Sequence, residues 1–327
     1  MAAKTRGDGL EAASCSRGRR EPDNVEPMTL EQLRVFVAVA ERQHVTRAAE
    51  ALNIAQSAVS ASIAALEGRH GAKLFHRVGR RIELTEAGAL FLAEARAVLA
   101  RAGSAELVLS ELGDLKRGVL SIYASQTIAG YWLPRHLVGF RRSHPGVAIR
   151  LSIGNTSQAA AAVRGGEADL GFVEGEVDDP ILVTEPVARD QLVIVVGAEH
   201  PWGESKGLGK EDLLNVDWVL REPGSGTRSN FEHALEALGV SPHNLRVALE
   251  LPSNEAVRAA AEAGMGAAVI SASVAAPSIE AGLLRQAAFA LPERCYYALR
   301  HAERYRSRAA ETLMDIIRGL LPAVGMK

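Results

Sequence analysis

Three helical patterns and a short basic segment follow one another within residues 28–88, and they limit the possible folds more than any other feature of the chain. Apolar residues recur every three or four positions over residues 33–40, which predicts an amphipathic helix, and residues 48–52 indicate a short second helix. A turn over 53–55 leads into a third helix over 56–67. This order is typical of a helix-turn-helix that presents its third helix to the major groove of DNA.

The third helix has one apolar side and one polar side. Val59, Ile63 and Leu66 share a face at helical spacing, whereas Ser57 and Ser60 lie on or beside the opposite face. We expect the apolar side to be buried. The polar side is then free to reach the edges of bases.

A run of basic residues without an intervening acid follows the third helix: Arg69, Lys73, Arg77, Arg80 and Arg81. With a turn at 78–79 and a short strand over 81–84, it predicts a basic wing. Cations beside the third helix displace condensed counterions and supply sequence-independent affinity, while groove contacts add discrimination. The alternative is an ordinary solvated charge run, but its coincidence with the three helices favours the wing.

Composition agrees with a soluble two-part protein. The 327 residues are 47% hydrophobic, no apolar run is long enough to span a membrane, and two cysteines are too few for a disulfide framework, so a cytoplasmic location is expected. The net charge is -2, yet residues 28–90 carry eight Lys and Arg against six Asp and Glu, which concentrates positive charge in the head. Residues 1–27 have almost no large apolar side chains, so we expect disorder there.

A long helix is expected over residues 89–117, which are rich in Ala, Leu, Glu and Arg. Its apolar residues include Leu90, Val98, Leu99 and Leu107. An apolar stripe between two domains is commonly buried against a second copy of the chain. Packing on the chain's own domains is the alternative, but the pattern favours a linker helix that assembles a homodimer or homotetramer.

Residues 118–327 alternate between strand and helix patterns, which predicts mostly parallel sheets covered by helices. They should form two α/β lobes, lobe 1 of about 118–189 and 291–327 and lobe 2 of about 190–290. Strands are expected over 119–124, 147–153, 169–173, 192–196, 218–220, 245–251, 267–271 and 295–300, and helices over 128–142, 158–164, 229–238, 255–263 and 302–319.

Three turns combine small polar side chains with the start of a helix. Residues 125–127 follow the first strand, residues 154–157 follow the second, and residues 224–228 lead into a helix of lobe 2. Hydroxyls and free amides at helix N-termini favour an anion, so we expect a carboxylate, sulfate or phosphate group between the lobes. Each turn could equally be a helix cap, and Arg228 could pair with the ligand, hold a helix end or pair with an internal carboxylate.

No enzyme signature accompanies these turns. The segment 224–228 lacks the spacing and lysine of a nucleotide-binding loop, no Gly-x-Ser-x-Gly motif occurs, and the nine histidines are dispersed. We therefore expect no enzyme, cofactor or metal site. Two functions stay open, a ligand-responsive DNA-binding regulator and a small-molecule binding protein whose head serves only assembly.

From residue 28 onward the chain resembles the LysR-type transcriptional regulators. The matching segments are Leu33-Arg34-Val35-Phe36, Ala48-Ala49-Glu50-Ala51-Leu52, Gln56-Ser57-Ala58-Val59-Ser60, Leu66-Glu67, Leu74-Phe75-His76-Arg77 and Leu84-Thr85-Glu86-Ala87-Gly88. The resemblance implies an N-terminal winged helix-turn-helix over 28–88, a linker helix and a two-lobed α/β effector domain like that of periplasmic binding proteins. It also implies a homo-oligomer that binds double-stranded promoter DNA and a small effector.

In that family, positions matching Gln56, Ser57 and Ser60 face DNA, and wing arginines matching Arg77 and Arg80 lie on or near the phosphate backbone. The resulting DNA-binding candidates are Thr46, Gln56, Ser57, Ser60, Arg77, Arg80 and Arg81. The family usually carries Arg where this chain has Ala61, so a bidentate guanine contact is missing there.

The second half looks like the branch that includes regulators of sulfur assimilation and carbon fixation. Its matching segments are Ser125-x-Thr127, Tyr131-x-Leu133-Pro134, Gly154-Asn155-Thr156 and residues 221–228. Effectors of that branch are small anionic metabolites held between the lobes. The resulting effector-binding candidates are Ser125, Gln126, Thr127, Asn155, Thr156, Gly226 and Thr227.

Overall fold

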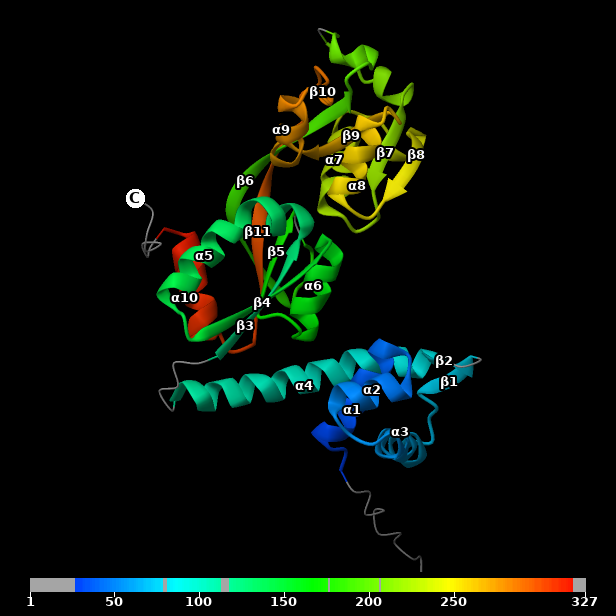
Figure 1. Ribbon diagram of the computed structural model, residues 1–327, viewed down its shortest axis with the longest axis vertical. Coiled ribbons are helices and arrows are strands. Elements are labelled where there is room, and N and C mark those ends of the chain that lie inside the picture. Colours follow the sequence, from blue (N-terminus) through cyan, green and yellow to red (C-terminus); the bar gives the residue numbers. More distant parts are fainter. Residues whose placement is uncertain (1–26, 79–80, 113–117, 176, 206, 320–327) are drawn as a thin grey trace, which may run out of the picture. The chain divides into compact units, whose positions relative to one another are not determined.

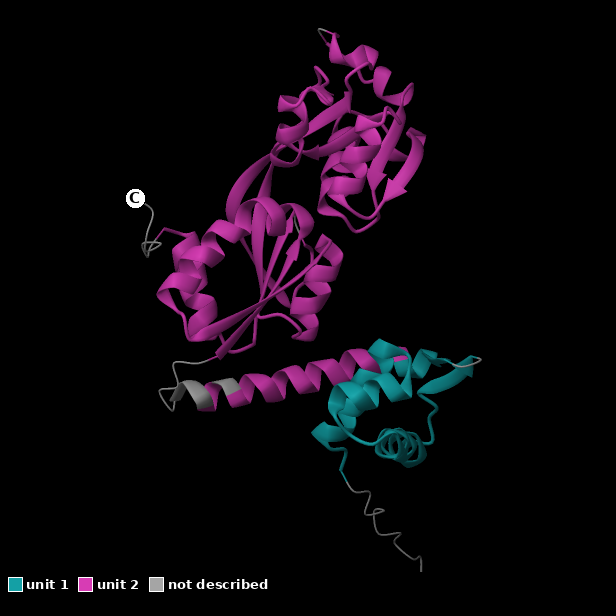
Figure 2. Cartoon of the chain, viewed as in Figure 1, with its two compact units in different colours: residues 1–88 teal, residues 89–327 magenta. Residues whose placement is uncertain are grey.

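The computed structural model describes residues 27–78, 81–112, 118–175, 177–205 and 207–319. The chain divides into two compact units, residues 1–88 and 89–327 (Figure 2). The disorder expected at the N-terminus concerns residues outside the described ranges, which begin at 27. No helix in those ranges is both long and apolar enough to cross a membrane.

The first unit contains three helices and a two-stranded antiparallel sheet. Its elements are α1 (Leu30–Arg42), α2 (Val45–Leu52), α3 (Gln56–His70), β1 (Phe75–Val78) and β2 (Arg81–Leu84). Thr29 and Gln32 form a capping box that starts α1, and Gln43 and Asn53 end α1 and α2 in the left-handed conformation. The predicted winged helix-turn-helix is confirmed, with β1 as an additional strand.

The core of this unit lies where the three helices meet. Val35 and Val39 of α1 pack with Ala48 of α2 and Val59 of α3. The Phe36 ring lies 5.3 Å from that of Phe75, centroid to centroid, and so ties α1 to β1. The apolar side of α3 is therefore directed inward, as predicted.

The second unit begins with the long helix α4 (Glu86–Leu112), most of which belongs to this unit, and continues into a nine-stranded sheet. Lobe 1 contains β3 (Gly118–Ser125), the π-helical turn η1 (Ile128–Trp132), α5 (Leu133–Ser143), β4 (Val147–Gly154), α6 (Thr156–Gly165), β5 (Leu170–Glu174), β11 (Glu293–His301) and α10 (Arg308–Ile317). Lobe 2 contains β7 (Asp217–Arg221), α7 (Gly226–Ala237), β8 (Arg246–Leu251), α8 (Asn254–Glu262), β9 (Ala267–Ser271), α9 (Ala272–Glu280) and β10 (Leu284–Gln286). Short 3-10 turns lie at Pro201–Gly203, Asp212–Leu214 and Pro242–Asn244.

The two lobes share β6 (Leu182–Gly197), a strand of 16 residues. The strand order is β4-β3-β5-β11-β6-β9-β7-β8, with β10 paired to β6. Pairs within each lobe, such as β3 with β4 and β7 with β8, are parallel, but β6 and β11 pair antiparallel with each other and with their other neighbours. The prediction of mostly parallel sheets is therefore wrong where the chain leaves lobe 1 on β6 and returns on β11.

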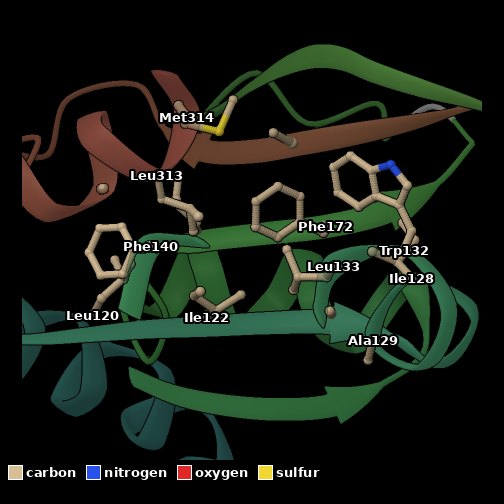
Figure 3. Packing of buried hydrophobic residues seen from close by; sticks show 14 of the residues in the cluster. Leu120, Ile122, Ile128, Ala129, Trp132, Leu133, Phe140, Phe172, Leu313 and Met314 are labelled. Carbon is tan, nitrogen blue, oxygen red and sulfur yellow. The ribbon is translucent and has the colours of Figure 1, made fainter. Parts of the chain in front are cut away.

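Helices cover both faces of the sheet in each lobe (Figure 1). In lobe 1, Phe140 of α5 and Leu313 of α10 pack with Phe172 of β5 on one face (Figure 3), while α6 covers the other. In lobe 2, Ile194 and Val195 of β6 enter different clusters, one beneath α7 and one beneath α8 and α9. This alternation is the two-residue period of a strand buried on both faces.

The last helix is shorter than expected. The sequence predicts a helix over 302–319, but α10 begins at Arg308, with Ser307 as its N-cap. Arg304, in the preceding segment, donates to the carbonyl oxygens of Val163 at 2.8 Å and Arg164 at 2.9 Å, at the end of α6. These tertiary hydrogen bonds outweigh local helix propensity and hold the segment as a loop.

One side of α4 rests on lobe 1 and another is exposed. Arg96 pairs with Glu167 at 3.1 Å, and Arg101 donates to the Glu303 carbonyl oxygen at 3.4 Å. Leu109 is 70% exposed, although it is a large apolar residue. The side chain of Leu107, part of the predicted apolar stripe, lies outside the described set.

Candidate functional site

The outward side of α3 carries the DNA-facing candidates. Gln56, Ser57 and Ser60 are exposed, and Thr46 on α2 is half-buried. Ala55 is the N-cap of α3 and gives no side-chain hydrogen bond, so the first backbone amides of this helix have no side-chain cap. An exposed polar face with an uncapped N-terminus is suited to bases and phosphates.

The two wing strands display exposed arginines next to this helix. Arg77 lies on β1 opposite Ile82, and Arg81 begins β2 opposite Val78; both arginines are exposed. Arg80, another candidate, lies outside the described residues. Arg77 and Arg81 are thus the two described candidates that can present a positive charge to a phosphate backbone.

Glu67 is a buried carboxylate in this unit whose role the sequence analysis did not recognise. It accepts hydrogen bonds from the Lys73 ammonium at 2.6 Å and from the backbone amides of Leu74 at 2.9 Å and Phe75 at 3.2 Å. Burial raises the pKa of Glu67, but these hydrogen bonds outweigh it, and the pKa is lowered overall. The carboxylate is therefore charged at neutral pH, and it engages Lys73, one of the predicted wing cations.

In the second unit, the candidates at the end of β3 form direct contacts between the lobes. Gln126 of lobe 1 donates to the Pro252 carbonyl oxygen at 2.8 Å and accepts from the Asn254 amide at 3.0 Å. Thr127 is buried and its hydroxyl accepts from the Asn254 side chain at 3.1 Å. Ser125 is also buried, but its hydroxyl has no hydrogen-bond partner among the described residues. It is the candidate with an unused polar group, which an effector could satisfy.

A chain of hydrogen bonds continues from Asn254 through lobe 2 and returns to lobe 1. Arg221 is buried and donates to the Asn254 oxygen at 2.6 Å and to both carboxylate oxygens of Glu222, at 2.8 and 3.0 Å. Asn155, the N-cap of α6, donates to Glu222 at 3.1 Å. Burial raises the pKa of Glu222, but hydrogen bonds from Arg221 and Asn155 outweigh it and lower the pKa overall.

The remaining candidates surround a second, fully buried charge cluster. The Thr156 hydroxyl donates to the Glu174 carbonyl oxygen at 3.2 Å, and the Thr227 hydroxyl accepts from Arg294 at 3.1 Å. A Cβ at Gly226 would overlap the Glu174 carbonyl oxygen and lie 2.6 Å from the Thr156 hydroxyl. The starts of α6 and α7 therefore touch, and only a glycine fits at that contact.

Arg294 on β11 and Asp190 on β6 are the centre of this cluster. Arg294 contacts Asp190 through Nε at 2.8 Å and Nη2 at 2.7 Å, with Glu174 3.9 Å away. The Ser271 hydroxyl donates to the second oxygen of Asp190 at 2.7 Å. The cluster joins the shared strands to both lobes.

Arg228 pairs mainly with carboxylates on its own helix and on β8, and it touches the first cluster only through the Arg221 carbonyl oxygen. It donates to Glu232 at 2.7 Å, to Glu250 at 2.5 Å and to the Arg221 carbonyl oxygen at 3.0 Å. Among the alternatives left open for this residue, the pairing with internal carboxylates is observed. It also borders a surface pocket of about 400 Å³ that contains none of the effector-binding candidates, lined by Arg228, Glu232, Glu236, Gly239, Val240, Ser241, Pro242 and His243.

Sequence patterns missed the buried polar residues that organise the second unit: Glu174, Asp190, Arg221, Asn254 and Arg294. A charged residue at the end of an apolar strand run, such as Glu174 or Arg221, was the available signal. Within the described part of the chain, no group of three or more His, Cys, Asp or Glu residues could hold a metal ion.

A winged helix-turn-helix followed by a two-lobed α/β unit defines a class of ligand-responsive regulators. Residues 30–89 match the family described as "Bacterial regulatory helix-turn-helix protein, lysR family", and residues 113–322 match the "LysR substrate binding domain". The chain therefore belongs to the LysR family of transcriptional regulators, as its sequence predicted.

Among similar proteins, one group carries a carbon-fixation name, in agreement with that part of the predicted branch. The chain is 34% identical to the "Uncharacterized HTH-type transcriptional regulator YeiE" of Escherichia coli, over 88% of this chain and 96% of that protein. It is 32% identical to a "Probable RuBisCO transcriptional regulator" of Trichormus variabilis, over 89% of this chain and 88% of the relative. Among solved structures, the Synechocystis CcmR regulatory domain in complex with 2-PG matches with a TM-score of 0.57 and 26% identity, covering 64% of this chain and 99% of that domain.

Proposed function

We propose that the chain is a homo-oligomeric regulator that binds promoter DNA through α3 and the wing and responds to a small anionic metabolite bound between its lobes. The buried Ser125 hydroxyl carries the effector part of the proposal, because no described residue hydrogen-bonds to it and it lies directly before a helix start. The relative solved with 2-PG supports a small-molecule ligand for this fold. The close contact between the starts of α6 and α7 at Gly226 supports a position for the effector on the side of Ser125 and Thr127.

Substitution of Ser125 by alanine tests the effector site. The change removes a hydroxyl without a protein partner, so folding stability should stay the same or rise. A hydrogen bond to a charged ligand contributes about 1.5–3 kcal/mol, so affinity for the effector should fall about tenfold or more. Calorimetry would compare sulfate, phosphate, O-acetylserine and phosphorylated C2 and C3 acids. Exposed Thr184→Val serves as the control for loss of a hydroxyl in lobe 1. Equal binding of an anion to wild type and to Ser125→Ala would remove Ser125 from the site.

A DNA titration separates this function from that of a binding protein whose head serves only assembly. Fluorescently labelled promoter and random duplexes would be titrated at two salt concentrations. The regulator binds both, prefers the promoter and weakens steeply as salt rises. An assembly head shows no salt-dependent binding to either duplex.

A further inference from the structure

The short segment from Lys73 to Phe75 joins three elements of the first unit. It follows α3, it leads into β1 of the wing, and it contacts the residues that begin α4. Its position decides where the wing arginines lie relative to the recognition helix. The contacts that hold this segment therefore bear on DNA binding, and Lys73 within it is also one of the predicted wing cations.

Glu67 holds one side of the segment. One carboxylate oxygen accepts from the backbone amides of Leu74 at 2.9 Å and Phe75 at 3.2 Å, and the other accepts from the Lys73 ammonium at 2.6 Å. Two consecutive backbone donors directed at one oxygen fix the direction of the chain as it enters β1. Only 9% of Glu67 is exposed, so solvent weakens the two amide hydrogen bonds little, whereas the Lys73 side chain is 80% exposed.

Thr85 holds the opposite side. Its amide donates to the Leu74 carbonyl oxygen at 3.0 Å, and its hydroxyl donates to the Lys73 carbonyl oxygen at 2.6 Å. The same hydroxyl accepts from the Gly88 amide at 3.0 Å, in the first turn of α4. A Cβ at Gly88 would overlap the Leu74 carbonyl oxygen, so the helix start lies directly against the segment.

We infer that Glu67 is a positioning residue for DNA binding, which together with Thr85 holds the wing in place beside the recognition helix. The inference rests on the proposed roles of α3 and the wing. Arg77 lies two residues beyond Phe75 on a strand of only four residues, so a displaced segment carries the arginine away from the phosphate backbone. By positioning the wing, Glu67 should raise the affinity for DNA, whereas its negative charge alone would lower that affinity.

Glu67→Gln in the full-length protein tests this. The variant keeps the shape of the side chain but loses its charge, so it loses the Lys73 ion pair and weakens both amide hydrogen bonds. Affinity for promoter and random duplexes alike should fall, and the slope of log affinity against log salt should become shallower by about one unit for each phosphate that the protein no longer neutralises. Glu31→Gln is the matched control: it removes the same charge from an exposed ion pair with Arg34. It should leave binding unchanged or tighten it.

Thr85→Val is a second variant, in which the side chain keeps nearly the same volume. It tests the same inference if Glu67→Gln does not fold. It should lower affinity and salt slope in the same way. A head that is merely less stable has a smaller active fraction but an unchanged slope, so the slope distinguishes positioning from folding. Tighter binding by Glu67→Gln, as by Glu31→Gln, or a slope equal to that of wild type would overturn the inference. Failure of the wild type to bind DNA would instead overturn the proposed function.

Discussion

Replacement of Arg294 by methionine should strongly destabilise the second unit, because it leaves two buried carboxylates without their cation. The side chain of Arg294 is 1% exposed, and that of Asp190, which it contacts at 2.7 Å, is 5% exposed. Removal of one partner from a buried pair costs about 3–5 kcal/mol. For a unit of this size, that loss corresponds to a fall in Tm of about 6–20 °C.

An exposed ion pair of the same length supplies the control. Arg246 contacts Asp217 at 2.7 Å, but their side chains are 58% and 45% exposed. Arg246→Met should cost less than about 1 kcal/mol, since an exposed pair exchanges solvent contacts for little gain. Urea unfolding of both variants and of the double variant Arg294→Met with Asp190→Asn would give the three free energies. Equal costs for the two single variants would refute the argument that burial, rather than distance, sets the contribution of the pair. The double variant should recover part of the loss, because Asp190 then carries no charge.

Three further predictions concern other parts of the molecule. Substitution of both Arg77 and Arg81 by alanine should reduce the salt slope of DNA binding by about two units, measured by anisotropy; an unchanged slope would contradict the wing assignment. Charged residues in place of Val98 and Leu109, which share one exposed side of α4, should dissociate the oligomer and weaken operator binding; light scattering would show an unchanged mass if the interface lies elsewhere. Burial, aided by Arg135, lowers the pKa of His136 to about 4, so this part of the stability of lobe 1 should decline as pH falls from 6.5 toward 4; a proton NMR titration of His136 with a pKa near 6.5 would contradict it.

Local patterns were sufficient for the three helices of the first unit, because their folding information is local. The face of α3 that carries Val59 and Leu66 is set by helical periodicity, and the left-handed residue Asn53 ends α2 within one turn of the predicted position. Strand β1 escaped detection because it has only four residues and three of them are exposed. Residues 75–78 form a strand because they pair with β2, and such pairing cannot be read from the local sequence.

The candidate site of the second unit could be predicted only in part. The turns that hold Ser125 and Asn155 have a local signature, since hydroxyl and amide side chains next to a strand end favour helix starts. Their partners have none: Thr127 and Asn254 are 127 residues apart, and the hydrogen bond between Arg294 and Thr227 spans 67 residues. Such pairings depend on how the strands are ordered in the sheet, which periodicity does not reveal.

The chain passes between the two lobes on one pair of strands, β6 and β11, so any rotation of lobe 2 relative to lobe 1 must deform this pair. Lobe 2 is an insertion in the chain of lobe 1, so both ends of the inserted segment leave through this one pair of strands. Paired strands twist, and the register of β6 and β11 shifts between Tyr296 and Tyr297, where Val187 is the extra residue on β6 between Pro186 and Ala188. A rotation of lobe 2 would twist this two-stranded ribbon and would also strain the hydrogen bonds that Gln126 and Thr127 form with lobe 2. We expect substitutions that stiffen or loosen this ribbon to change how readily lobe 2 rotates relative to lobe 1, although these residues contact neither effector nor DNA.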